Sequence, residues 1–389
     1  MEPPFYPAGV KMDVYVVSYI VLAIPAFFLL IGIELIAVRI AGRNDYRLAD
    51  SVGDLSCGIV QQLLEVFLKT ALFAGYAFVF ERLRVATMPS SSGLAWVACF
   101  VGVDFFYYWF HRMSHEVNAI WATHVVHHQS EDFNLAVALR QGAFQGCMSW
   151  VFYLPLAWMG FPPAMFLTIV SINTLYQFWI HTQLIGRLGP LEGVLNTPSN
   201  HRVHHGRNPK YIDRNHGGTL IVWDRLFGTY QAEEEAPVYG ITTPLASWNP
   251  VWANVHYWVE LVGLARRATG LGDRLRVFLK PPGWRPEALG GFQQPRDVDV
   301  ASYRKWESNP PKAWVRYAFV QFILALGAAS FLLFRQDTLS TRALALGAGL
   351  ILASLVVIGG LLENRRWAIP GEGVRLLAIA ALILSRLAG

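Results

Sequence analysis

Charged residues are scarce in this sequence. Asp, Glu, Lys and Arg make up only 15% of its 389 residues, whereas a soluble domain carries about 25%. Hydrophobic residues account for 54% of the chain, and the mean hydropathy is +0.34. The shortage of charge disfavours a water-soluble domain and predicts a protein that is embedded in a membrane.

Cysteine is equally scarce. The three cysteines, Cys57, Cys99 and Cys147, lie far apart in apolar stretches, and none belongs to a CxxC pair. A disulfide framework and a zinc–thiolate site are therefore not expected. We expect these residues to be small buried hydrophobic side chains.

The sequence also lacks a basic tract of the kind that binds nucleic acid, and no nucleic-acid partner is expected. The formal net charge is only +5, which we assign to lysine and arginine on the cytoplasmic side of membrane helices. Neither a basic leader nor a small-residue cleavage signal accompanies the first apolar run. We therefore expect this run to be a retained helix and not a removed signal.

Long apolar runs dominate what is present. A spanning helix needs about 20 apolar residues, and the candidates are Val14–Ile40, Cys57–Val79, Leu94–Phe110, Phe144–Met159, Pro163–Ile180, Trp314–Phe334, Ala343–Leu362 and Val374–Leu387. They predict an all-α, polytopic integral membrane bundle of about eight spans. The polar, proline-rich stretch 181–312 predicts a cytoplasmic, histidine-rich cap that holds two metal ions at the helix ends.

The runs divide the chain into four expected regions. Residues 1–93 form N-terminal membrane helices, 94–235 the catalytic region, 236–312 a cap segment and 313–389 C-terminal membrane helices. Arginines after the first and seventh runs place those ends in the cytoplasm, although Arg82 and Arg84 point the other way. We expect a multi-pass protein with a cytoplasmic active site, in the inner membrane if the source is bacterial.

Histidine is concentrated in a few places. The segment "HRMSH" contains an i, i+4 pair, "HVVHH" and "HRVHH" each contain an i, i+3, i+4 triplet, and one histidine stands alone in "QFWIHT". Residues at these spacings share one face of a helix. Thr197 and Pro198 resemble the start of a helix under the last triplet, and Gly206 resembles its end.

Nine imidazoles on converging faces exceed the needs of one ion and suit two. The expected ligands are His111, His115, His124, His127, His128, His181, His201, His204 and His205. Imidazole suits iron, zinc and copper. The remaining histidines, His216 and His256, are expected to be ordinary hydrogen-bonded residues outside the site.

Ligating histidines need neighbouring acceptors, and two divalent ions need negative charge. Asp104 lies seven residues before His111, so it either orients that ring or joins two helices. The other candidates are Glu116, Asp132, Asp213, Asp224, Asn134, Asn208 and Asn215, and the alternative for each of them is a residue that stabilises a turn or the fold. The aromatic run 105–110, which includes Tyr108, is typical of an interfacial belt or lines an apolar substrate slot.

These histidine boxes resemble the fatty acid hydroxylase / sterol desaturase superfamily of membrane oxygenases. Within it, the chain is most similar to the alkylglycerol monooxygenase family. The narrower resemblance rests on "WFHRMSHEVNAIWATHVVHHQSEDFNLAVALRQ", "NHRVHHGRNPKYIDRNHGGTLIVWDRLFGTYQ", "VYGITTPLASWNP", "FLKPPGWRPEALG" and "GGLLENRR". It covers most of the chain from about residue 95 onward.

The resemblance implies a chemistry. That family uses two non-haem iron ions, tetrahydrobiopterin and dioxygen to hydroxylate the ether-linked carbon of an alkylglycerol, a lipid substrate that enters from the bilayer. The hemiacetal formed then collapses to a fatty aldehyde and a glycerol derivative. Glu116, directly after the first box, is the implied catalytic residue linked to pterin use, and Tyr108 in the aromatic run is our candidate for holding the pterin ring. Zinc can replace iron in purified samples, because nitrogen sites bind it more tightly.

Two other interpretations stay open. The first is a sterol or fatty acid hydroxylase or desaturase of the same superfamily, with a redox partner protein as electron donor or with another pterin. The second is a non-catalytic metal-binding or transport protein of the membrane. A metal transporter would have its ionisable ligands near the middle of the spans, whereas the histidines here lie at their ends. Release of a fatty aldehyde from an alkylglycerol would favour the ether-cleaving activity over the first alternative. A continuous polar path through the bilayer would favour transport.

Overall fold

The computed structural model describes residues 19–387, and within them all regular structure is helical apart from one isolated bridge between Leu195 and Leu220. The prediction of an all-α fold is thereby confirmed. The α-helices are α1 Tyr19–Ile40, α2 Leu48–Leu83, α3 Gly93–Glu116, α4 Asn118–His128, α5 Leu135–Ala138, α6 Gln145–Ser149, α7 Leu154–Met159, α8 Pro163–Trp179, α9 Pro198–His204, α10 Val222–Phe227, α11 Pro250–Arg267, α12 Leu271–Leu279, α13 Lys312–Phe334, α14 Thr341–Leu362 and α15 Ala368–Leu387. Three 3₁₀ turns complete them, η1 Trp150–Tyr153, η2 Gly189–Gly193 and η3 Glu287–Leu289.

Four helices are long and apolar enough to cross a membrane, namely α1 from Leu22, α3, α13 and α14. A fifth candidate is α2, which bends by 50° between Leu68 and Ala71 and passes the same test only if its two parts are counted as one span. The outer face of α1 exposes Leu29, Ile33 and Ile36, as expected of a lipid-facing surface. The chain is therefore an integral membrane protein with four or five candidate spans among residues 19–387.

The predicted count of about eight spans is not confirmed. Residues 145–159 are divided among α6, η1 and α7, so they form no single long helix. Helix α8 has 17 residues, about 25 Å by the rise of an α-helix, which is less than the hydrocarbon thickness. Helix α15 contains the buried ion pair of Glu372 and Arg375. The first expected span begins at Val14, and residues 14–18 lie outside the described range.

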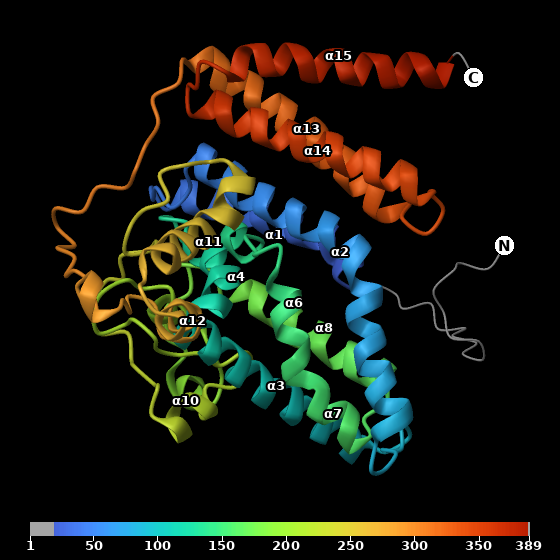
Figure 1. Ribbon diagram of the computed structural model, residues 1–389, viewed down its shortest axis with the longest axis vertical. Coiled ribbons are helices and arrows are strands. Elements are labelled where there is room, and N and C mark those ends of the chain that lie inside the picture. Colours follow the sequence, from blue (N-terminus) through green and yellow to red (C-terminus); the bar gives the residue numbers. More distant parts are fainter. Residues whose placement is uncertain (1–18, 388–389) are drawn as a thin grey trace.

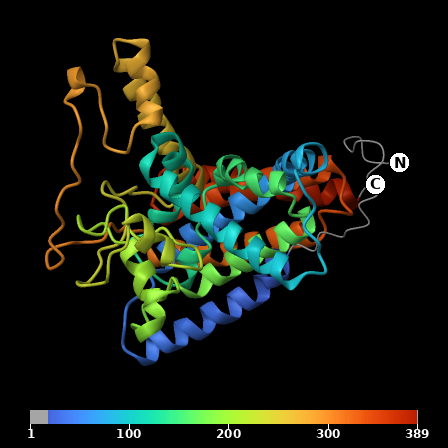
Figure 2. The same ribbon diagram turned by 90° about the horizontal axis from the view of Figure 1, so that it is seen from below.

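The long helices lie together, and the polar connections gather at one end of them. Figure 1 shows α13 and α14 side by side with α15 beside them, and α2 below. An apolar core joins α2, α13 and α14 through Ile59, Phe322 and Leu355. Seen from below in Figure 2, the loops of residues 180–310 and the helices α11 and α12 collect at the same end of the bundle. The three cysteines lie within the packed helices. Cys57 and Cys99 are buried as predicted, and Cys147 is half-buried.

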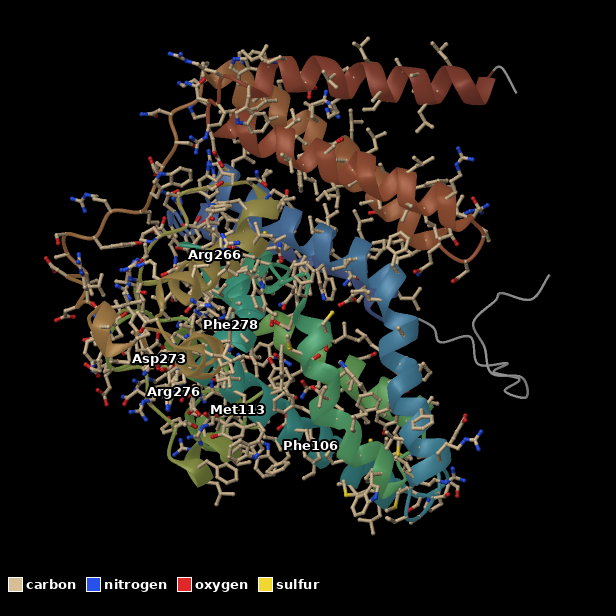
Figure 3. All side chains as sticks on the ribbon, in the orientation of Figure 1. Phe106, Met113, Arg266, Asp273, Arg276 and Phe278 are labelled. Carbon is tan, nitrogen blue, oxygen red and sulfur yellow. The ribbon has the colours of Figure 1, made fainter. Side chains whose placement is uncertain are left out.

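Helix α3 links the membrane part to this polar end. Along it, Phe106 lies toward the membrane part and Met113 toward α11 and α12, on which Arg266, Asp273, Arg276 and Phe278 are labelled in Figure 3. The chain then bends at Val117, which has extended backbone angles, and α4 begins at Asn118. The side-chain amide of Asn118 donates to Val277 O at 2.9 Å, so α12 holds the first turn of α4.

The loop that follows α5 is pressed between α2 and α4. Arg140, only 3% exposed, donates to Val126 O, Asp54 and Gln129, and so ties the loop to both helices. At Gly142, an added Cβ would lie 1.9 Å from Thr123 O of α4. This loop can therefore approach α4 so closely only because residue 142 has no side chain.

We predict that Gly142→Ala forces the loop away from α4 and lowers the free energy of unfolding by about 1–3 kcal/mol, the usual range for overpacking. The matched control is Gly146→Ala in α6, where the added Cβ meets only Leu72 Cδ1, at 3.5 Å. Thermal unfolding in detergent checks both variants. Equal stability of the Gly142→Ala variant and the wild-type protein would contradict the assigned close approach.

Candidate metal centre

Four separate segments bring the clustered histidines to one place. His111 and His115 lie in the last turns of α3, and the "HVVHH" triplet ends α4. The "HRVHH" triplet occupies α9, which has Thr197 as N-cap, Pro198 in its first turn, and its last residue two positions before Gly206. His181 lies just past the end of α8, directly after its C-cap residue Ile180. The helix boundaries expected around the last triplet are therefore confirmed.

The nine histidines form two groups. Within each group, one ring nitrogen per histidine lies within 4.8 Å of those of all the others. The His111 group contains His111, His115, His124, His128 and His204. The His127 group contains His127, His181, His201 and His205. Every one of these side chains is buried.

Main-chain carbonyls and one amide hold the rings in place. The Nδ1 atoms of His111, His127, His181 and His204 lie 2.7–2.9 Å from the carbonyl oxygens of His216, Arg140, Gln177 and Arg214, respectively. The Nδ1 of His124 lies 2.8 Å from the side-chain oxygen of Gln145. A carbonyl oxygen only accepts, so each Nδ1 carries the proton and each Nε2 is left with a lone pair.

These lone pairs face one another. Nε2 of His111 lies 3.0 Å from Nε2 of His124, and Nε2 of His127 lies 3.2 Å from Nε2 of His181. Two acceptors at this distance repel unless a cation lies between them. Nε2 of His204 is buried without a hydrogen-bond partner, and such atoms are rare in proteins. The donor set therefore fits metal ions, one in each group.

Burial also keeps the rings in the form that binds metals. It lowers the pKa of His124 and of His181 to about 4. The pKa of His127, His128 and His205 lies well below 6.5, because burial disfavours the charged ring and the neighbouring histidines add repulsion. At neutral pH these imidazoles are uncharged, and the neutral ring is the metal ligand.

Most of the candidate acceptors stabilise the fold and do not contact a ring, which is one of the two roles expected of them. Asp104 receives hydrogen bonds from Thr219 N, Leu220 N, Trp223 Nε1 and Asn173, so it joins α3 to α8 and to a loop and touches no imidazole. Of the proposed charge-balancing residues, Asp213 approaches a ring, with its Oδ1 3.4 Å from His115 Nδ1. The remaining candidates hold the loops around the groups, and these are Asp132, Asp224, Asn134, Asn208 and Asn215.

Glu116 and Tyr108 lie at the edge of the His111 group. Arg112 connects them, because its Nε donates to Glu116 at 2.8 Å and its Nη1 to the Tyr108 hydroxyl at 3.2 Å. Tyr108 is fully buried, whereas about a third of the Glu116 side chain is exposed. Asp213 lies nearby with a half-exposed side chain, and partial desolvation together with the charge of Glu116 raises its pKa to about 6. A polar cofactor could reach Glu116 from water.

The two histidines expected outside the site differ from each other. His256 is half-buried in α11, and its Nδ1 donates to Ala253 O at 3.1 Å, as expected of an ordinary residue. The expectation for His216 is wrong. It is fully buried beside the His111 group, and neither ring nitrogen has a hydrogen-bond partner. Because it stands outside any i, i+3 or i+4 pattern, its sequence position carries no sign of this placement.

Comparison with known proteins identifies the family. The fatty acid hydroxylase family model matches residues 96–229, the segment that contains all nine grouped histidines. The alkylglycerol monooxygenase of Homo sapiens is 39% identical over 368 residues, which are 94% of this chain and 82% of that protein. The alkylglycerol monooxygenase of Xenopus tropicalis is 38% identical over 371 residues, 92% of this chain and 81% of that protein.

A more distant relative is the ornithine lipid hydroxylase OlsE of Rhizobium tropici, 30% identical over 132 residues, 33% of this chain and 39% of that protein. No solved structure matches the chain. Both alkylglycerol monooxygenases are similar to this chain over nearly its whole length. The chain belongs to the alkylglycerol monooxygenase family, and it is a lipid-modifying oxidoreductase.

Proposed function

We propose that the two histidine groups hold two iron ions, one in each, and that the nine grouped histidines are their ligands. The support is the inward direction of the Nε2 lone pairs, with His111 and His124 only 3.0 Å apart. Bound iron supplies the oxidising chemistry that an unactivated C–H bond requires. Zinc replaces it in samples that have lost iron, because nitrogen sites bind zinc more tightly than ferrous iron.

The proposed reaction is hydroxylation of the ether-linked carbon of an alkylglycerol by dioxygen, after which the hemiacetal gives a fatty aldehyde and a glycerol derivative. The names of the relatives in Homo sapiens and Xenopus tropicalis support this substrate. Helix α3 supports it as well, because it combines an apolar span with His111 and His115 at its polar end. An alkyl chain that lies along α3 can thus bring its ether carbon to the metals.

The proposed reductant is a tetrahydropterin that binds beside Glu116 and Tyr108. Arg112 pairs with Glu116 and hydrogen-bonds the Tyr108 hydroxyl, so the three side chains form one polar edge next to the His111 group. In this position the Glu116 carboxylate can accept hydrogen bonds from the amino and ring N–H groups of a pterin. A protein electron donor is the alternative that the experiment below distinguishes.

The proposed topology places the polar end of the bundle, and the metals with it, on the cytoplasmic side of the membrane. Positive charge supports this side, because Arg39 lies in the last turn of α1 and Arg43 just after it, and Arg365 and Arg366 follow α14. In this arrangement α8, α15 and the 145–159 segment also cross or enter the bilayer, which gives about eight membrane segments. In a bacterial source the membrane is the inner one.

The substrate proposal predicts a product. Full-length protein loaded with iron, given an alkylglycerol, dioxygen and tetrahydrobiopterin, should release one fatty aldehyde per substrate consumed, measured by mass spectrometry. A parallel reaction with a fatty acid or a sterol is the control for the other members of the superfamily. Two bound metals without aldehyde would contradict the ether substrate, and aldehyde that forms only with a protein donor would contradict the pterin.

The ligand assignment predicts that His128→Ala and His204→Ala each lose metal from the His111 group and lower activity by at least about 100-fold, more than loss of a residue that only supports a ligand. His256→Ala is the matched control, because His256 lies in α11 and bonds to Ala253 O. Element analysis of the purified variants gives the metal content. Full metal content in His204→Ala would remove that residue from the ligand set.

Acid should destabilise the metal-free protein. An unfolded histidine binds its proton near pH 6.5, whereas buried His124 and His181 bind theirs only near pH 4. Between these values the unfolded chain holds more protons, so stability falls as the pH falls. Carboxyls with raised pKa values, such as Asp213 and Asp224 at about 6, act in the opposite direction. The histidines outnumber them, because the pKa values of five more buried rings lie well below 6.5, namely those of His127, His128, His201, His204 and His205. We expect the melting temperature to drop steadily from pH 7 to pH 4.5, and a flat profile would contradict the assigned neutral rings.

A further inference from the structure

His216 is buried completely, yet both of its ring nitrogens lack a hydrogen-bond partner. A neutral imidazole has one donor and one acceptor, and both are normally satisfied when the ring is buried. Nothing in the fold or in the proposed ligand set explains this ring. Its surroundings indicate what it serves.

Three rings of the His111 group surround it. The centroid of the His216 ring lies 5.0 Å from that of His115, and 5.7 Å from those of His111 and His204. Rings within the group lie at similar spacings, such as 5.5 Å between His111 and His115. His216 is therefore next to the group, although its nitrogens do not belong to the five that lie within 4.8 Å of one another.

The backbone around His216 is fixed in an unusual conformation. Asp213 and Asn215 both have φ of 57°, in the left-handed region that residues with side chains seldom adopt. Such strain persists where surrounding contacts impose it, and it is frequent at functional sites. Here Asp224 accepts the N–H of His216 at 2.7 Å, and the carbonyl of His216 accepts from His111 Nδ1 at 2.8 Å. The ring is thus held where it is.

The metal chemistry suggests a role. On an ion that takes six ligands, the five imidazoles of the His111 group would leave one position free, and catalytic metal sites keep such a position open for a small ligand. If the N–H of the His216 ring lies beside this position, a ligand bound there would be the hydrogen-bond acceptor that the protein itself does not provide. The nitrogens of His216 lie outside the set of five ring nitrogens that are within 4.8 Å of one another. This position favours a hydrogen bond from His216 to the bound ligand over direct coordination of the ion.

We propose that His216 is a further residue of the metal centre, which hydrogen-bonds the small ligand that fills the open position on the ion of the His111 group. This inference rests on the proposed two-metal function and deepens it. His216 then has two contacts with the centre, the main-chain carbonyl that orients His111 and the ring beside the open position.

The test uses full-length protein in detergent, loaded with cobalt(II), with azide as the probe and visible absorption as the readout. His216→Phe keeps a planar ring but removes both nitrogens. We expect this variant to retain two cobalt ions and to bind azide about tenfold or more weakly, the effect of losing one hydrogen bond to a charged ligand. His216→Gln, which retains an N–H donor, should recover part of the affinity, and His256→Phe should bind azide as the wild-type protein does.

Unchanged azide affinity in His216→Phe with both cobalt ions present would overturn the proposal. Loss of one cobalt ion from both His216→Phe and His216→Gln would overturn it too, because His216 would then be a ligand. A wild-type protein that binds no pair of cobalt ions would instead refute the two-metal function itself, and the role of His216 would fall with it. Cobalt content and azide affinity are measured on the same samples, so these failures are distinguishable.

Discussion

The arrangement of the polar end depends on the hydrogen bonds from imidazole Nδ1 atoms to carbonyl oxygens. Each such bond fixes the tautomer of a ring and turns its Nε2 lone pair inward. In His111 and His124 this brings two lone pairs to 3.0 Å, an approach that is repulsive without a cation. A chain folded in this way concentrates repulsion at two points, and the proposed metal ions at those points would remove it.

Much of the surrounding fold maintains these bonds. The bend at Val117 places α4 against α3, so that histidines from two helices meet. The loop after α5 supplies the carbonyl of Arg140 to His127, and Gly142 allows that loop to lie close to α4. The buried carboxylate of Glu34 in α1 receives hydrogen bonds from Leu135 N and from Thr182, the residue after His181. A membrane helix thus supports the turn that carries one of the rings.

The helices that carry the histidines were predictable from the sequence, because they depend on residue spacing and composition. The i, i+3, i+4 pattern placed the rings of each triplet on one helix face, and α9 begins and ends where Thr197, Pro198 and Gly206 indicated. The partners of the rings were not predictable, since a main-chain carbonyl can come from any residue type. His216 was missed for a related reason. It enters through a strained turn between Asp213 and Gly217, which leaves no periodic signal. The predicted span count is not confirmed where apolar composition coincides with broken helices, as in residues 145–159.

The central claim is that two cations, one in each histidine group, neutralise the converging lone pairs. Anomalous X-ray scattering from crystals of the iron-loaded, full-length protein, recorded at the iron absorption edge, tests it most directly. The account predicts two peaks, one among the Nε2 atoms of the His111 group and one among the ring nitrogens of the His127 group. A single peak, or peaks that lie away from the nine rings in a protein confirmed to contain iron, would contradict it.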